Sequence, residues 1–223
     1  MSLKMGKIVN LLRYISGLPK SIYVNFRLLP LSQAIYLPII VSRKTKLQSL
    51  AGEVRLQKVK TGMIRIGFGN MQMLDYTYRR TLLCIEGIVT FKGKCKIGMA
   101  SRLMVYGHLE LGENFLISGD AMIVCTKKIA IGDNSTLAWE SIVMDTDHHE
   151  IFDSLGKRLN PDQEVVIGSN VWVGARSFIL KGSVIPDGSI IGANTTMTKS
   201  FIHENCIIAG NPPRILRQGV YWK

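Results

Sequence analysis

The sequence predicts an all-β protein built as a parallel β-helix, and three observations support this prediction. Residues 167–202 divide into six hexapeptides, and neither an α-helix nor a single strand has a period of six. Glycine, asparagine, aspartate and serine, which favour turns, fill many of the positions between. The first residue of every hexapeptide is aliphatic: Ile167, Val173, Ile179, Ile185, Ile191 and Met197. Stacked coils bury such residues together, which one coil alone cannot do.

The same period continues towards the N-terminus as far as residue 85. Apolar residues stand at positions 85, 91, 97, 103 and 109, then at 111, 117, 123 and 129, then at 131, 137 and 143. Each of the two slips adds two residues, and we expect them to be longer corners that leave the stack intact. Residues 71–81 do not keep the period, and we expect a bulging coil or loop there. A β-rich but irregular pattern begins near residue 50, so the predicted β-helix spans residues 50–202.

The two ends of the chain lie outside the repeat. In the N-terminal segment, residues 1–49, we expect a short helix over residues 5–17 that is closed by Gly17 and Pro19. Residues 21–41 are apolar but interrupted by prolines, which predicts extended segments and turns. Residues 203–223 form the predicted C-terminal tail, with a turn at 210–213.

Positive charge is concentrated at the N-terminal end. The first 60 residues hold eleven Lys and Arg against one acid, Glu53, while the whole chain carries a net charge of +12. Such asymmetry is evidence about partners rather than about the fold. Because no nucleic-acid-binding motif is present, we expect no nucleic acid partner. Residues 7–20 mix apolar and basic side chains as interfacial helices do, so residues 1–45 are a candidate contact with an anionic membrane. The alternative is a helix packed on the β-helix or on a neighbouring subunit.

The cysteines and the apolar runs indicate the compartment. The four cysteines are scattered without a CxxC pair, which is typical of reduced, buried thiols. No apolar run is long enough to span a bilayer, and the first residues lack the apolar core of a signal peptide. We therefore expect a cytoplasmic protein, located at the inner face of the membrane if the N-terminal segment binds lipid.

The repeat is interrupted once, by a polar loop at residues 145–165. A long excursion of this kind is costly to order and is typical of a functional segment. It contains His148 and His149, which follow Asp145 and Asp147. Histidine titrates near neutral pH, so it can take a proton from a hydroxyl and return it to a thiolate, while a flanking carboxylate fixes the tautomer. The alternative is a solvated histidine pair on a surface loop.

In three features the sequence resembles the hexapeptide-repeat acyltransferases, such as the maltose, galactoside and capsular-polysaccharide O-acetyltransferases. These features are the repeat itself, the Asp-x-Asp-x-His pattern at 145–149, and the segment IIAGNPPRILR at 207–217. The resemblance covers residues 85–217 and is strongest over 142–217. It implies a left-handed β-helix with three hexapeptides per coil, and a homotrimer with each active site between two subunits. It also implies acetyl-CoA as the acyl donor, a carbohydrate acceptor, a place in polysaccharide biosynthesis, and no metal.

The resemblance also assigns residues to the site. The Asp-x-Asp-x-His pattern selects Asp147 and His149 as catalytic, whereas an ungapped count from the repeats of the maltose and galactoside enzymes selects His148 as the base. Coenzyme A is strongly anionic, so lysine and arginine side chains in the donor site would bind it electrostatically. The residues matching donor-binding positions are Trp172, Gly174, Ala175, Lys181, Ala193, Asn194, Thr198, Lys199, Arg214 and Arg217. Pro213 replaces the usual alanine of the family signature.

The function that these residues predict is acetyl transfer from acetyl-CoA to a sugar or glycan hydroxyl, with a histidine as general base and no covalent enzyme intermediate. Three alternatives remain open: N-acetylation of an amino sugar or nucleotide-linked amino sugar, a non-catalytic trimeric scaffold, and a zinc enzyme of the γ-carbonic anhydrase type. The last requires three histidines around one zinc ion, and the spacing of His108 and His203 from the loop does not supply them.

Overall fold

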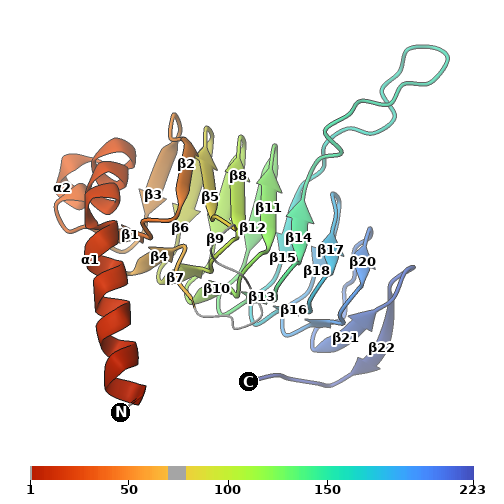
Figure 1. Ribbon diagram of the computed structural model, residues 1–223. Coiled ribbons are helices and arrows are strands. Elements are labelled where there is room, and N and C mark those ends of the chain that lie inside the picture. Colours follow the sequence, from red (N-terminus) through yellow and green to blue (C-terminus); the bar gives the residue numbers. More distant parts are fainter. Residues whose placement is uncertain (1, 70–78) are drawn as a thin grey trace.

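The chain folds as a three-sided solenoid of stacked coils (Figure 1). The computed structural model describes residues 2–69 and 79–223, and the strands described form three sheets, which we name sheets A, B and C. Sheet A consists of β1 (Ile39–Val41), β4 (Ile64–Ile66), β7 (Cys95–Ile97), β10 (Phe115–Ile117), β13 (Thr136–Leu137), β16 (Trp172–Val173), β19 (Ile190–Ile191), β21 (Cys206–Ala209) and β22 (Arg214–Gln218).

The other two sheets complete each coil. Sheet B consists of β2 (Lys46–Ser49), β5 (Leu82–Ile85), β8 (Arg102–Val105), β11 (Met122–Cys125), β14 (Ile142–Met144), β17 (Phe178–Ile179) and β20 (Thr196–Met197). Sheet C consists of β3 (Glu53–Leu56), β6 (Ile88–Phe91), β9 (His108–Leu111), β12 (Lys128–Ile131), β15 (Val165–Ile167) and β18 (Val184–Ile185). The chain passes from A to B to C in each coil, so we name the turns the A–B, B–C and C–A corners. The predicted parallel β-helix is confirmed.

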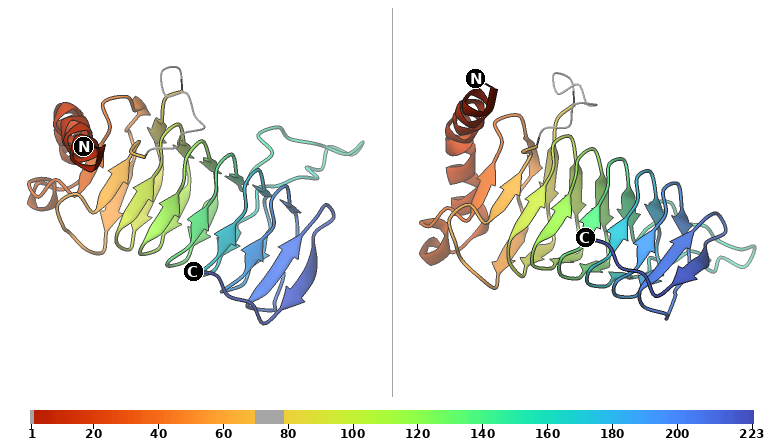
Figure 2. Two further views of the ribbon diagram at one scale, coloured as in Figure 1. Left: turned by 60° about the horizontal axis from the view of Figure 1, so that its bottom comes forward. Right: turned by 90° about the horizontal axis from the view of Figure 1, so that it is seen from below.

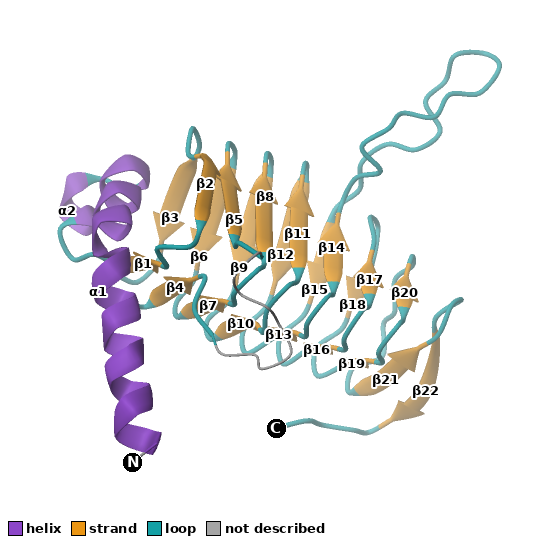
Figure 3. Ribbon diagram, viewed as in Figure 1, coloured by secondary structure: helices purple, strands orange, loops and turns teal. Residues whose placement is uncertain are grey.

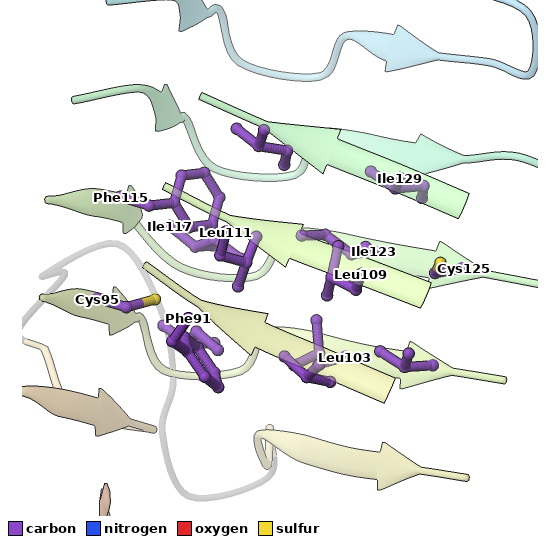
Figure 4. Packing of buried hydrophobic residues seen from close by; sticks show 14 of the residues in the cluster. Phe91, Cys95, Leu103, Leu109, Leu111, Phe115, Ile117, Ile123, Cys125 and Ile129 are labelled. Carbon is purple, nitrogen blue, oxygen red and sulfur yellow. The ribbon is translucent and has the colours of Figure 1, made fainter. Parts of the chain in front are cut away.

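The aliphatic repeat positions point into the tube and form its core. All six residues of the clean repeat, from Ile167 to Met197, are at most 1% exposed. Figure 4 shows the same arrangement in earlier coils, where Phe91, Leu111 and Phe115 lie in stacked layers between the strands. Burying each such side chain stabilises the fold by about 1.5–3 kcal/mol. The four cysteines are also buried and unpaired, as the sequence indicates.

The two slips in the period have a different cause from the one expected. Ile88 pairs with His108 and His108 with Lys128, so these coils advance by 20 residues. Trp172 pairs with Ile190, an advance of 18. The additional two residues lie in the longer strands of sheet B, where a further inward side chain such as Cys125 is buried beside Ile123. The prediction of longer corners was therefore wrong; the strands themselves are longer.

The N-terminal helix is much longer than predicted. α1 spans Ser2–Leu28 and continues through Gly17 and Pro19, which we expected to end it, and a short α2 follows at Leu31–Ala34. Residues 21–28, expected to be extended, are helical. Gly17 is required for packing, since a Cβ there would lie 2.3 Å from the carbonyl oxygen of Val41. Packing against β1 therefore outweighs the local helix-breaking signals.

Helix α1 also caps the open edge of sheet A. Asn25 accepts a hydrogen bond from the Ile39 N–H (3.1 Å) and donates one to the Ile39 carbonyl (2.6 Å). The Ser21 hydroxyl accepts from the Val41 N–H at 2.8 Å. Both side chains are fully buried. Side chains of α1 thus form hydrogen bonds with the backbone groups at the edge of β1, and the helix covers this edge. Both features prevent β1 from pairing with another chain.

The solenoid extends beyond the predicted limits. Parallel pairing begins at β1, ahead of residue 50, and continues to β21, beyond residue 202. β22 then returns antiparallel to β21. The helices lie at one end and this hairpin at the other (Figure 3). The loop expected at 71–81 falls mainly on residues 70–78, outside the described residues. None of the described helices is long and apolar enough to cross a membrane.

Candidate active site

The interruption of the repeat is a projecting loop at a B–C corner. It joins β14 to β15 and leaves the solenoid as a long hairpin (Figures 1 and 2). Its two ends meet, because the Gln163 N–H donates to the Asp145 carbonyl at 3.1 Å. Further out, the Leu159 N–H donates to the Ile151 carbonyl at 2.7 Å. The predicted excursion is therefore an ordered arm with a closed root.

Asp145 anchors this arm to the solenoid. Its side chain is fully buried, and its two oxygens accept hydrogen bonds from the backbone N–H groups of Thr126 (2.7 Å) and Lys127 (2.9 Å). Those two residues form the B–C corner of the preceding coil. The first aspartate of the Asp-x-Asp-x-His pattern is thus structural, and it fixes where the pattern begins.

Asp147 is bound to other parts of the loop root rather than to an imidazole. Its Oδ2 lies 2.5 Å from Lys181 Nζ and 2.8 Å from Asn160 Nδ2. These hydrogen bonds, that from Lys181 foremost, lower the pKa of Asp147 below its ordinary value. Lys181, which we predicted as a donor-binding residue, also donates to the Asn160 carbonyl at 3.1 Å. The ammonium group therefore holds the loop root to the next coil.

The two histidines are exposed, but the backbone that carries them is fixed. The His149 N–H donates to the Asp147 carbonyl at 2.7 Å, and the His149 carbonyl accepts from Asn160 Nδ2 at 2.8 Å. His148 has a left-handed backbone (φ +61°), and its N–H donates to Thr146 Oγ1 at 3.0 Å. Within the described residues, neither imidazole ring has a hydrogen-bond partner. Both rings are open to a substrate or to a neighbouring subunit.

Asn160 is a site residue that the sequence analysis missed. Its side-chain amide joins Asp147 and His149, and its Oδ1 accepts from the Ile151 N–H at 2.6 Å. It lies 11 residues after His149 on the returning side of the arm. In the sequence, an asparagine before Pro161 is typical of an ordinary turn. Its role is visible only in the structure, where the two sides of the arm meet at the root.

The predicted donor-binding residues lie on two edges of the solenoid. Gly174, Ala175, Ala193 and Asn194 occupy successive A–B corners, whereas Lys181, Thr198 and Lys199 occupy successive B–C corners below the arm. Sheet B separates the two edges within one chain. A Cβ at position 174 would lie 2.6 Å from the Ile191 carbonyl oxygen, so close stacking of coils already requires this glycine.

The C-terminal hairpin brings further predicted residues to the A–B edge. The Gly210 N–H donates to Thr195 Oγ1 at 3.2 Å, which places the 210–213 turn beside the corner of Ala193 and Asn194. Arg214 follows this turn directly, and Arg217 lies further along β22; both are exposed. None of the ion pairs among described residues includes either arginine.

Trp172 lies on the outer face of sheet A and is covered in part by the C-terminal tail. Its side chain is 41% exposed, and its ring centroid lies 6.2 Å from that of Trp222. Trp222 Nε1 donates to the Asn170 carbonyl at 2.6 Å, which holds the tail in place. The structure therefore separates Trp172 from the B–C edge that carries the histidines.

The other two histidines lie elsewhere. His108 is in β9, where its Nε2 is 3.1 Å from Thr90 Oγ1, and His203 is exposed after β20. Across residues 2–69 and 79–223, no three His, Cys, Asp or Glu side chains are grouped so as to hold a metal ion. The expected absence of a metal stays a prediction.

Comparison with known proteins identifies the repeat. Residues 164–199 match the sequence model of the family described as bacterial transferase hexapeptide (six repeats). The putative lipopolysaccharide biosynthesis O-acetyl transferase WbbJ of Escherichia coli K12 is 25% identical over 191 residues, 80% of this chain and 94% of the relative. Over its repeat, the chain is similar to the bacterial hexapeptide transferases. The predicted resemblance to the hexapeptide-repeat acyltransferases and the predicted acyltransferase class are confirmed.

Other relatives of the hexapeptide-repeat protein match it over shorter stretches. Galactoside O-acetyltransferase of E. coli K12 is 33% identical over 115 residues, 51% of this chain and 56% of the relative. Polysialic acid O-acetyltransferase of E. coli O1:K1 / APEC is 30% identical over 132 residues, 59% of this chain and 41% of the relative. The chain thus spans about half the length of these two enzymes.

A solved structure supports the fold. The crystal structure of the polysialic-acid-specific acetyltransferase NeuO superposes with a TM-score of 0.54 at 23% sequence identity, covering 83% of this chain and 81% of that one. The predicted fold class, a left-handed parallel β-helix with a helical N-terminal segment, is confirmed.

Proposed function

We propose that this hexapeptide-repeat protein is an acetyl-CoA-dependent O-acetyltransferase that acts on a hydroxyl group of a sugar or glycan, in polysaccharide biosynthesis. The observation that carries the proposal is the fixed backbone of His149 at the closed root of a projecting arm, with the imidazole exposed. The names of the relatives support the same chemistry, since they include O-acetyltransferases of a galactoside and of polysialic acid.

His149 is the proposed general base. Its imidazole takes the proton of the acceptor hydroxyl while the hydroxyl oxygen attacks the carbonyl carbon of the acetyl thioester. The carbon–sulfur bond then breaks, and the imidazolium returns the proton to the departing thiolate. Asp147 contributes indirectly, by holding Lys181 and Asn160 in the root that positions residue 149. We retain His148 as the alternative base.

The chemistry of the A–B edge fits an anionic donor such as coenzyme A. Arg214 lies there exposed beside the small residues Ala193 and Asn194, and guanidinium groups bind phosphate in a bidentate manner. Lys181 is poorly suited to bind the donor, because its ammonium group is already hydrogen-bonded to Asp147 and Asn160. We therefore assign Lys181 to the loop root and the exposed Lys199 to the donor.

A homotrimer would unite the two edges. Within one chain, sheet B lies between the A–B corners and the B–C corners that carry the arm. Three solenoids packed side by side about a three-fold axis can place the A–B edge of one against the B–C edge of the next. The resemblance to trimeric enzymes favours this arrangement, and we propose it as the functional state. The four unpaired thiols favour a cytoplasmic location.

An acceptor screen tests the function. The purified protein is incubated with acetyl-CoA and sugars, nucleotide sugars or glycans, and free thiol is measured. We expect thiol release with hydroxyl acceptors, and product analysis showing an O-acetyl ester. Transfer to amino sugars alone would indicate an N-acetyltransferase. The absence of both acetyl-CoA binding and thiol release would support the scaffold alternative.

A further inference from the structure

Helix α1 has an exposed apolar face in addition to the face that packs on β1. Leu12, Ile15, Ile22 and Phe26 follow one another at intervals of three, seven and four residues, which places them on one side of the helix. The exposed apolar row consists of six side chains that are 42% to 59% exposed: Leu12, Ile15, Leu18, Ile22, Tyr23 and Phe26. A row of this length on a surface marks an interaction site.

The row faces away from the solenoid. The opposite side of the helix carries the buried Ser21 and Asn25, which bind the edge strand β1. Helix α1 lies across the N-terminal end of the stack, with the C-terminal hairpin at the far end (Figures 1 and 2). The exposed row therefore points outward along the direction of stacking. Three further apolar side chains in and after α2, which follows α1 directly, are also exposed: Leu31, Ile35 and Tyr36.

Basic side chains lie beside the apolar row. Arg13, Lys20 and Arg27 are spaced by seven residues, so they form a second row along the same helix. This row lies towards the first coils: Arg13 donates to the Gly69 carbonyl at 3.4 Å and Lys20 to the Arg43 carbonyl at 2.7 Å, whereas Arg27 is exposed. Lys20 also lines a surface hollow next to the first coil, together with Arg43, Lys44, Lys46 and Arg80. The described residues that line this hollow include no carboxylate. Burial foremost, and then the neighbouring charges of Arg80 and Arg43, lower the pKa of Lys20 below its ordinary value.

We infer that this end of the solenoid, the apolar row with its flanking cations, docks on an anionic membrane surface. Apolar side chains along one face of a helix insert into the headgroup region, and neighbouring Lys and Arg bind lipid phosphates. A second copy of the chain is a poorer occupant, because face-to-face contact would bring two sets of like charges together. Nucleic acid would pair with the cations but leave the apolar row exposed. The inference does not depend on the proposed acetyl transfer.

Vesicle flotation with the full chain tests this docking. Phosphatidylcholine vesicles with and without phosphatidylglycerol are compared at low and high salt. Wild-type protein should float with the phosphatidylglycerol vesicles, should remain unbound to phosphatidylcholine alone, and should bind less in high salt. Failure to bind the anionic vesicles would overturn the inference.

Matched variants locate the surface. Ile15→Gln combined with Ile22→Gln, and separately Arg27→Glu, should each weaken binding by about tenfold or more. The control pair, Ile202→Gln with Leu216→Gln, changes exposed aliphatic side chains at the opposite end and should bind as wild type. Circular dichroism checks that all variants are folded. Unchanged flotation of the Ile15/Ile22 variant would contradict the proposed face. Lipid-free association that this variant abolishes would identify a second copy as the occupant instead.

Discussion

Lys181 Nζ lies 2.5 Å from Asp147 Oδ2, so a side chain of one coil holds the root of the arm that leaves the previous coil. The same ammonium group donates to the Asn160 carbonyl on the returning side of the arm. Both sides of the root are thereby fixed to the solenoid. The position of His149 depends on this contact, because residue 149 is hydrogen-bonded to Asp147 and Asn160.

Replacing Lys181 should loosen the arm without unfolding the solenoid. We expect Lys181→Met to lower kcat/KM for acetyl transfer by roughly ten- to a hundredfold, because small displacements of a catalytic group have effects of this size. Trypsin should cut the arm faster at Lys157 or Arg158. The control Lys199→Met, at the same edge one coil later, should leave the cleavage rate unchanged and raise the KM for acetyl-CoA. Equal cleavage rates for wild type and Lys181→Met would contradict this role.

The hydrogen bonds to Asp147 predict how the root responds to acid. Because they lower its pKa below the ordinary value of 3.8, the ionised root is stabilised above that value and loses this stabilisation as pH falls through the lower, folded pKa. The amide signal of His149 in NMR spectra should titrate with a midpoint below 3.8, and Lys181→Met should raise that midpoint. A midpoint at or above 3.8 in the wild type would show that the ion pair is not formed in solution.

Asp145 should matter for stability rather than for chemistry. Asp145→Ala removes the acceptors of the part-buried N–H groups of Thr126 and Lys127, and each such loss costs about 1–3 kcal/mol. We expect the free energy of unfolding in urea to fall by about 2–5 kcal/mol. Asp153→Ala removes a comparable acceptor at the exposed tip of the arm and should have little effect. Similar losses for both variants would contradict the anchoring role.

Gly17 should be required for α1 to dock on β1. A methyl group there would lie 2.3 Å from the Val41 carbonyl oxygen, so Gly17→Ala must displace the helix. Overpacking of this kind costs about 1–3 kcal/mol. Faster hydrogen exchange of the Ile39 and Val41 amides would report the change, with Ser16→Ala on the exposed side as the control. Unchanged exchange in Gly17→Ala would contradict the close contact.

The core was predictable because it is periodic. The inward residues from Ile85 to Met197 follow from spacing alone, and nearly all are buried. The cause of the slips was not predictable, since two residues added to a strand or to a corner shift the count equally. α1 was underestimated because Gly17 and Pro19 are local helix-breaking signals. The packing that overrides them is with a strand that is distant in the sequence: Ser21 and its partner Val41 are 20 residues apart.

The candidate site was predictable in part for the same reason. The loop and its histidines stand out where the period fails. The separate roles of Asp145, Asp147 and Lys181 depend on contacts between coils, which the spacing of a motif does not contain. The role of Asn160 depends on contact between the two sides of the arm, and no local sequence pattern predicts that contact.

The imidazole of His149 is the proposed general base for acetyl transfer. The most direct test is the rate of thiol release from acetyl-CoA, with the acceptor found in the screen, for His149→Ala, His148→Ala and the distant control His203→Ala. A general base contributes about 10²–10⁴-fold, so His149→Ala should lose at least a hundredfold in kcat, while the other two variants stay within a few fold of wild type. Wild-type turnover by His149→Ala would contradict the assignment, and a comparable loss in His148→Ala alone would transfer the role to that residue.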